Sequence, residues 1–223
     1  MHIGRIIDLS HEIVPGKEEY KLEVETHFVD ELLSHYKGKR NPDDWYIMQE
    51  ITLWDHVGTH IESPYHAVKE GADVSQLSIA NLIGDAVILD FQHKGFGEPI
   101  TEDEMRQAGE NLIREGDIVF IKTGLSKYYH TEHSHDRPYL ANDAVKWLVE
   151  RKIHCLGVDC SGIENRTIKE QPNHRTLFEA GIPLIEHLNN LNALQENRVT
   201  VFILPYPIKG VASFPVRVIA IEE

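Results

Sequence analysis

Short apolar runs rich in β-branched residues recur along the chain and set its predicted architecture. Runs of roughly four to eight such residues predict strands, several of them buried on both faces. The predicted strands span residues 46–54, 86–91, 117–122, 155–159, 199–204 and 214–221.

Helical segments with start and stop signals lie between these strands. They span residues 101–112, 142–151 and 173–180. Thr101 and Glu104 form a capping box at the start of the first helix, and Asn142 is expected to cap the second. Gly181 follows the third helix as its C′ residue, where a left-handed conformation is common.

The alternation of strands and helices predicts an α/β fold. Because extra strands lie near both ends of the chain, we expect a mixed sheet or barrel-like core with flanking helices, in a single domain over residues 1–223. The secondary structure of residues 17–38 is left unassigned, because residues 18–27 alternate like a strand whereas residues 28–35 have helical spacing.

Composition excludes several classes of partner. The formal net charge is -14, so no basic stripe is available for nucleic acid or for an anionic membrane surface. No apolar run approaches the length of a membrane span. Cys155 and Cys160 lie in an apolar stretch without CxxC spacing, which predicts reduced core thiols. We therefore expect a cytoplasmic protein that binds neither nucleic acid nor membrane.

The densest group of chemically active side chains lies between residues 56 and 66. The segment reads His56-Val-Gly-Thr-His60-Ile-Glu62-Ser-Pro-Tyr-His66. Imidazole and carboxylate groups are ligands of divalent first-row metals. The segment is therefore a candidate metal site.

Geometry decides which backbone could build that site. In a regular strand His56 and His60 would lie roughly 13 Å apart, at about 3.3 Å per residue. In a helix, Glu62 would point about 240° away from His56. A curled loop that begins at Gly58 and stops near Pro64 can instead converge all three side chains on one metal.

A second group of histidines occurs at His130, His133 and His135, beside Asp136. With 14 histidines in 223 residues, some clustering is expected by chance. The surrounding segment is polar throughout, which predicts a solvated surface loop rather than a metal site.

Two later segments could complete the metal site. His174 opens the third predicted helix, and Glu186 ends an apolar run where a charge is costly to desolvate. Each has an ordinary alternative, a plain helix-start histidine and an exposed helix-start acid. Asp159 either orients a ligand histidine, the favoured reading, or simply ends a strand. Ser161 lacks the first glycine of a G-x-S-x-G elbow, so no serine nucleophile is expected.

Taken together, these segments resemble the cyclase-like metal-dependent hydrolases, the family of bacterial kynurenine formamidase and isatin hydrolase. The resemblance runs in order through nearly the whole chain. Its motifs are His56-x-Gly-Thr-His60-x-Glu62-x-Pro-x-His66, Gly157-Val-Asp159, His174-Arg175, Gly181-Ile-Pro-Leu-Ile-Glu186, Leu204-Pro-x-x-Ile-Lys-Gly210 and Pro215-Val-Arg217.

The resemblance implies one or two divalent metal ions, Zn²⁺ or Mn²⁺. It implies that His56, His60 and Glu62 hold the first ion. It also implies that His174 and Glu186 help to hold a second, with the two carboxylates able to bridge. Glu62 stands where the family usually has Asp, one methylene shorter, which leaves the identity of the metal open.

The same resemblance assigns His66 as the acid/base. It implies a swivelling β/β/α type of fold and a homodimer or higher assembly with active sites near subunit contacts. Val14 precedes Pro15-Gly16 where kynurenine formamidases carry an aromatic residue, so an aromatic formamide substrate loses support.

Such a site predicts a hydrolase that opens an amide, lactam, lactone or ester bond of a small carboxylate-bearing molecule. Zn²⁺ or Mn²⁺ lowers the pKa of bound water from 15.7 towards about 7. An imidazole that titrates near 6.5, such as His66, suits proton transfer to the leaving group. The ligand types leave two alternatives: a non-haem iron oxygenase with a two-His-one-carboxylate site, and a non-catalytic metal-binding module with a saturated ion.

Overall fold

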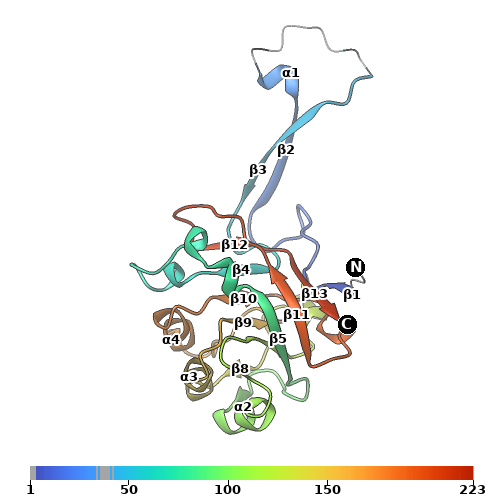
Figure 1. Cartoon of the computed structure of the whole chain (residues 1–223). Helices are drawn as coiled ribbons and strands as arrows, with labels where there is room; N and C mark the ends of the chain where they lie inside the picture. Colours follow the sequence, from blue (N-terminus) through green and yellow to red (C-terminus); the bar gives the residue numbers. More distant parts are fainter. Residues whose placement is uncertain (1–3, 34, 36–40, 42, 223) are drawn as a thin grey trace.

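A nine-stranded mixed sheet forms the centre of the protein in a computed structural model, which describes residues 4–33, 35, 41 and 43–222 (Figure 1). Four neighbouring strands in the middle of this sheet run parallel, and the strands on either side pair antiparallel. In spatial order the strands are β1 (Arg5–Asp8), β13 (Val218–Glu222), β11 (Arg198–Ile203), β5 (Ile83–Asp90), β7 (Ile118–Lys122), β9 (Cys155–Val158), β10 (Leu184–Glu186), β4 (His60–Glu62) and β12 (Ser213–Pro215). The prediction of an α/β fold with a mixed sheet is confirmed.

Two apolar layers cover the two faces of the parallel strands. Val119 and Ile121 of β7 join the layer that includes the helices, whereas Ile118 and Phe120 point into the opposite layer. Successive side chains of a strand point to opposite faces, so a strand buried on both sides becomes a continuous apolar run. The helices that flank the sheet together in Figure 1 are α2 (Glu102–Gly109), α3 (Asn142–Glu150) and α4 (Pro172–Glu179).

The predicted helix signals are confirmed at two positions and wrong at one. Thr101 accepts a hydrogen bond from the backbone N–H of Glu104, whose carboxylate accepts one from Thr101 in return. Gly181 follows α4 with a φ of +77°. Asn142, however, is the first residue of α3 rather than its cap, and its side-chain amide donates to Thr176 of α4. The amide therefore links α3 to α4 instead of capping the start of α3.

The run 214–221, predicted as one strand, forms parts of two. β12 pairs with β4 at one edge of the sheet, whereas β13 pairs with β1 and β11 near the other. Between them, Val216 N–H donates to the carbonyl of Thr59. Hydrophobic pattern alone could not reveal this crossing, because both strands are apolar.

A hairpin arm projects from the body of the protein (Figure 1). It consists of β2 (Leu22–Phe28) and β3 (Ile47–Leu53), which pair antiparallel, and of the short helix α1 (Val29–Leu32). The unassigned segment 17–38 therefore contains both elements that its pattern indicated, a strand followed by a short helix. The remainder of that segment includes residue 34 and residues 36–38, which lie outside the described residues.

Both cysteines lie in the core. Cys155 and Cys160 are both free and buried, as predicted. Among the described residues, no helix has the length and hydropathy needed to cross a membrane.

Candidate metal centre

Sheet register brings three of the predicted ligands together. His60 and Glu62 are alternate residues of β4 and therefore share a face. β10 pairs antiparallel with β4 so that Glu186 lies directly opposite His60. Directly opposed side chains of neighbouring strands lie within contact distance. A buried acidic residue at the end of β10 is thus placed beside the histidine motif, which lies far earlier in the chain.

The loop before β4 supplies His56. Gly58 has a φ of +68°, and a Cβ there would lie 2.6 Å from Cγ1 of Ile13. Only glycine combines that conformation with that close approach at low cost. The resulting turn brings Nε2 of His56 to 3.0 Å from Oε1 of Glu62, and the rings of His56 and His60 to 5.0 Å between centroids. The predicted turn at Gly58 is confirmed, but the curled loop expected from Gly58 to near Pro64 is wrong over His60–Glu62, because pairing with β10 and β12 holds these residues in the strand β4.

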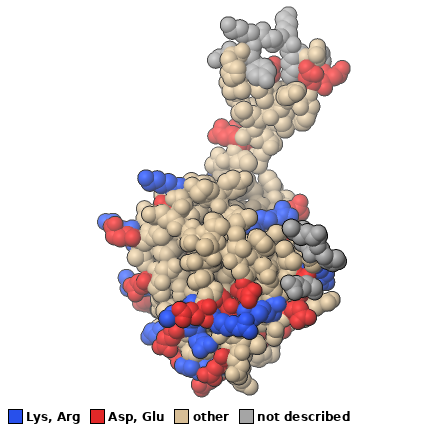
Figure 2. Space-filling model, viewed as in Figure 1, with Lys and Arg blue, Asp and Glu red and all other residues tan. Residues whose placement is uncertain are grey.

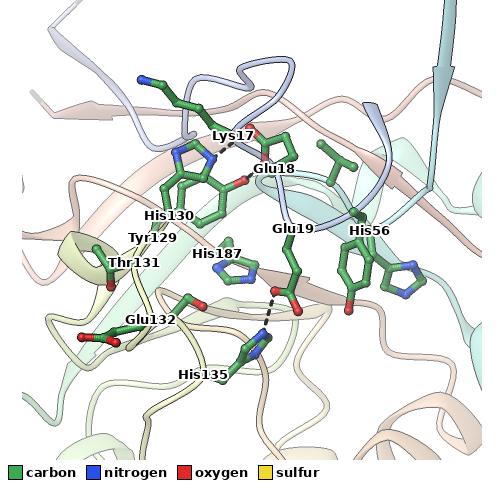
Figure 3. Close-up of a pocket in the computed structure, with 14 residues that line it drawn as sticks. Lys17, Glu18, Glu19, His56, Tyr129, His130, Thr131, Glu132, His135 and His187 are labelled. Carbon is green, nitrogen blue, oxygen red and sulfur yellow. Dashed lines mark hydrogen bonds and ion pairs between the residues drawn. The ribbon is translucent and has the colours of Figure 1, made fainter. Parts of the chain in front are cut away.

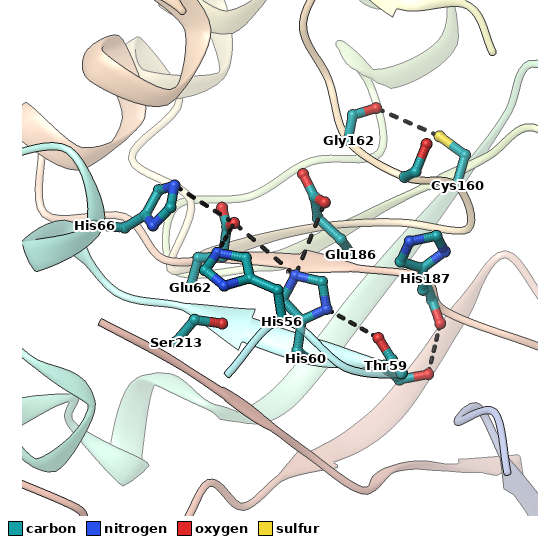
Figure 4. Close-up of polar contacts among 12 residues, drawn as sticks. His56, Thr59, His60, Glu62, His66, Cys160, Gly162, Glu186, His187 and Ser213 are labelled. Carbon is teal, nitrogen blue, oxygen red and sulfur yellow. Dashed lines mark hydrogen bonds and ion pairs between the residues drawn. The ribbon is translucent and has the colours of Figure 1, made fainter. Parts of the chain in front are cut away.

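Two further histidines, His174 and His66, approach Glu62 from helical segments, and Figure 4 shows His66 beside Glu62. His174, in the first turn of α4, places Nε2 at 3.3 Å from Oε2 of Glu62 and 3.6 Å from Oε1 of Glu186. His66 ends the 3₁₀ turn Pro64–His66, with Nε2 at 3.8 Å from Oε1 of Glu62. The structure therefore gathers all six predicted site residues around the carboxylates of Glu62 and Glu186.

Sequence reasoning missed Glu164, and it was wrong about Asp159. Asp159 accepts hydrogen bonds from the backbone and hydroxyl of Thr123 and from the backbone of Gly124, and it orients no histidine among the described residues. Oε1 of Glu164 instead lies 2.9 Å from Nδ1 of His174 and accepts from the backbone N–H of the same residue. Asp159 and Glu164 both follow β9, and no local sequence pattern shows which of them orients the imidazole of His174.

Electrostatics couple the cluster tightly. Burial alone would raise the pKa of Glu62, but the neighbouring imidazoles of His174, His56 and His60 hold it well below its usual range. Burial opposes the charged form of His56, yet its bonds to Glu62 and Asp55 raise its pKa to about 9. The pKa of His174 is likewise well above its usual value, against the effect of burial, because of bonds with Glu164, Glu186 and Glu62. Positive charge beside the buried carboxylates of Glu62 and Glu186 therefore stabilises them.

His66 behaves differently from its neighbours. Its side chain is half-buried, and burial lowers its pKa below the usual 6.5, with the Glu62 charge opposing that shift. His66 is consequently neutral at pH 7 and available to accept a proton at a ring nitrogen.

The donor set fits a divalent cation. Nε2 of buried His60 has no hydrogen-bond partner among the described residues, and its nearest carboxylate oxygens lie 3.8 and 3.9 Å away, on Glu186 and Glu62. An orphaned buried nitrogen is costly unless something else satisfies it. Ligand atoms lie within 4.8 Å of one another in two overlapping sets, His56 with Glu62 and His66, and His60 with Glu62 and Glu186. These sets divide the donors differently from the resemblance, which placed His56 and His60 together.

A cavity of about 360 Å³ opens beside these donors. Tyr20 and Trp54, at the base of the hairpin arm, form part of its wall and stack with ring centroids 5.7 Å apart. Arg137 and Ser161 line it as well. The candidate metal centre is therefore accessible to a small molecule.

Two members of the second histidine group, His130 and His135, line a neighbouring cavity (Figure 3). Nε2 of His130 lies 2.9 Å from Glu18, and Nε2 of His135 lies 2.6 Å from Glu19. The prediction of a polar surface loop is confirmed for His130 and His133, which are exposed residues, whereas His135 is partly buried. Glu18 and Glu19 contact the two cavity-lining histidines from the N-terminal segment, a relationship that local composition could not reveal.

Comparison with known proteins identifies the family of this chain. The Cyclase family model, described as "Putative cyclase", matches residues 7–165. The chain belongs to the Cyclase family. Kynurenine formamidase of Bacillus cereus (strain ZK / E33L) is 28% identical over 170 residues, which cover 76% of this chain and 78% of that protein.

Solved structures agree with this assignment. One described as "Potential Metal-Dependent Hydrolase With Cyclase Activity" superimposes with a TM-score of 0.77 at 28% identity, over 98% of each chain. An isatin hydrolase bound to the product analogue thioisatinate superimposes with a TM-score of 0.81 over 97% of this chain and 92% of that chain. At 19% identity, the isatin hydrolase shows a shared fold.

Proposed function

We propose that this member of the Cyclase family is a metal-dependent hydrolase of an amide bond, linear or cyclic, or of an ester bond in a small carboxylate-bearing molecule. The observation that carries the proposal is the convergence of four histidines on the two buried carboxylates of Glu62 and Glu186 beside an accessible cavity. The kynurenine formamidase relative and the metal-dependent hydrolase structure support this predicted class of enzyme.

His56, His60, Glu62, His174 and Glu186 are the proposed ligands. Zn²⁺ or Mn²⁺ is the proposed metal, as one or two ions, and when bound it lowers the pKa of coordinated water and polarises a carbonyl. The two carboxylates hold the positive charge in place, and Glu164 keeps Nε2 of His174 turned towards them. The burial of His60 and Glu62 excludes bulk water from this side of the site.

His66 is the proposed acid/base. It lies at the wall of the cavity rather than beneath it, and its side chain is more exposed than those of His60 and His174. Hydrolysis of an amide adds water across the C–N bond, so the leaving nitrogen must gain the proton that water loses. Nε2 of neutral His66 can take up that proton and return it to the leaving group.

Tyr20 and Trp54 offer a stacking wall for a planar substrate. These two rings supply aromatic surface to the cavity, although Val14 stands where the resemblance to kynurenine formamidases leads us to expect an aromatic residue. A planar amide such as an N-formyl aniline or a cyclic aryl amide is therefore the proposed class to examine first.

Metal analysis of the freshly purified protein, coupled to a hydrolysis screen of N-formyl aromatics, cyclic amides and lactones, tests the proposal. We expect Zn²⁺ or Mn²⁺ and turnover that a chelator removes. The variant His60→Ala should lose both metal and turnover, whereas exposed His133→Ala should keep both. Ferrous iron with a requirement for O₂ would favour the oxygenase instead, and a tightly held ion without turnover would favour a structural module.

We also propose a homodimer that covers the hairpin arm. A two-stranded hairpin by itself is marginally stable in water, and this arm exposes apolar side chains along its length. Figure 2 shows that charged side chains gather on the body while much of the arm is uncharged. The exposed apolar residues of the arm are Val24, Leu32, Trp45, Tyr46, Met48 and Ile51. Because Trp54 at the base of the arm lines the cavity, a dimer contact along the arm would lie near the candidate site, as the resemblance implies.

The predicted cytoplasmic location stays a prediction.

Light scattering after size-exclusion chromatography tests this assembly. Val24 and Ile51 are cross-strand partners and both are exposed. Ile51→Glu should convert dimer to monomer, whereas Ile79→Glu, at an exposed position outside the arm, should not. A wild-type monomer at micromolar concentration would contradict the proposal.

A further inference from the structure

One cation faces the cavity beside the candidate metal centre. Among the described residues that line it, Arg137 is the only lysine or arginine, and three of the others are the acids Glu62, Glu164 and Glu186. Arg137 precedes Pro138, where the chain returns from the 129–136 segment towards β8 (Tyr139–Leu140). A guanidinium here is the complementary group for an anion that enters the cavity.

The backbone fixes the orientation of this guanidinium. Nε of Arg137 donates to the carbonyl of Gly162 at 2.7 Å, and Nη1 donates to the carbonyl of His135 at 3.4 Å. In the described part of the chain, no acidic side chain forms an ion pair with Arg137. Two neutral carbonyl partners position the group without neutralising its charge. Nη2 is left without a protein acceptor among the described residues.

Gly162 places that free edge beside the metal-binding carboxylates. A Cβ at Gly162 would lie 2.6 Å from Oε1 of Glu186 and 3.1 Å from Nη2 of Arg137, so both atoms border the same small space. Figure 4 draws Gly162 on the loop next to Glu186. Since glycine has no side chain, this space stays open between the guanidinium and the candidate metal centre.

We infer that Arg137 is the specificity-determining residue of the site and binds the carboxylate of the substrate through Nη2. This inference rests on the proposed function and adds the group that selects an anionic substrate over its neutral analogue. The scissile bond then lies at the Glu62 and Glu186 end of the cavity, and the carboxylate lies at the Arg137 end. The short separation between them favours an acid substituent close to the amide, as in an ortho-substituted aryl amide.

A matched pair of substrates and a matched pair of variants test the inference. 2-Formamidobenzoate and formanilide share the N-formyl aniline and differ by one carboxylate. For Arg137→Gln we expect KM for 2-formamidobenzoate to rise about 10- to 100-fold, the range of a lost charge-assisted hydrogen bond. For formanilide, which has no carboxylate for Arg137 to bind, both kcat and KM should change less than about threefold. Arg166→Gln is the control, because Arg166 donates to the same His135 carbonyl but does not line the cavity.

Binding without turnover separates this inference from the proposed function. We expect calorimetry to show 2-aminobenzoate binding more tightly than aniline to the wild type, with the preference lost in Arg137→Gln and kept in Arg166→Gln at unchanged metal content. Persistence of the preference in Arg137→Gln, or its absence in the wild type, would overturn the inference. A different result is a wild type that binds 2-aminobenzoate preferentially yet hydrolyses neither 2-formamidobenzoate nor formanilide. That result would count against the proposed function and leave Arg137 as an anion-binding residue.

Discussion

Oε1 of Glu164 lies 2.9 Å from Nδ1 of His174 and also accepts hydrogen bonds from the backbone N–H groups of Asn173 and His174. A single carboxylate oxygen thus caps the start of α4 and orients an imidazole. Because Nδ1 is occupied by the hydrogen bond, Nε2 is the nitrogen turned towards Glu62. Carboxylates that orient ligand histidines in this way affect metal affinity strongly.

Glu164→Gln should therefore weaken metal binding by about 10- to 100-fold. Glutamine can still accept from the two backbone N–H groups, so we expect the helix and the melting temperature to change little. Competition with a chromophoric chelator measures the affinity. Glu179→Gln, on the exposed surface of the same helix, is the control. Equal affinities of the two variants would show that Glu164 acts as a cap alone.

His66→Ala should separate proton transfer from metal binding. We expect metal content to stay at the wild-type level and kcat to fall by about 10²- to 10⁴-fold, the usual contribution of a positioned acid or base. Elemental analysis and steady-state kinetics on one preparation give both quantities. Loss of the metal would instead make His66 a ligand, a role that the set His56, Glu62 and His66 also permits.

Protons and metal should compete for the site. Hydrogen bonds to carboxylates overcome burial and raise the pKa of His56 to about 9 and that of His174 well above its usual value. A ligand histidine must be neutral, so metal binding near pH 7 has to release protons. Calorimetry in two buffers of different ionisation enthalpy should show this release. Identical binding enthalpies in the two buffers would argue against it.

Stability without metal should depend on pH with a definite sign. The folded-state pKa of His56 exceeds its unfolded value near 6.5, so its contribution to stability is fully present below pH 6.5 and is lost as pH rises towards 9. The melting temperature of chelator-treated protein should therefore fall across this range. His56→Gln should flatten that dependence, and an unchanged slope in this variant would assign the effect to other groups.

Gly58→Ala should destabilise the loop that presents His56. The added Cβ would meet Ile13 at 2.6 Å in a left-handed backbone conformation. Gly97 has a φ of +74°, and a Cβ added there would have nothing within 4 Å, so Gly97→Ala isolates the backbone cost alone. That cost is about 1 kcal/mol, and we expect Gly58→Ala to exceed it by about a further 1–3 kcal/mol, the typical cost of overpacking. Urea denaturation of both variants checks the difference.

The sequence by itself determined the class of the fold and the core of the site. Buried strands such as residues 118–122 are continuously apolar because both faces pack, and this pattern is visible without coordinates. The histidine motif was visible for a similar reason. Gly58 and the closely spaced His56, His60 and Glu62 are local, and local geometry excluded one regular element across all three, although His60 and Glu62 themselves lie in the strand β4.

Only the tertiary structure decided the remaining partners. Glu186 reaches His60 through strand pairing, and Glu164 displaces Asp159 as the group that orients His174, because contacts between distant segments follow from sheet register and helix placement. The same reason explains the division of residues 213–222 into two strands and the orientation of Arg137 by two backbone carbonyls. Such relationships depend on where the chain returns in space, which the periodicity of a single segment does not encode.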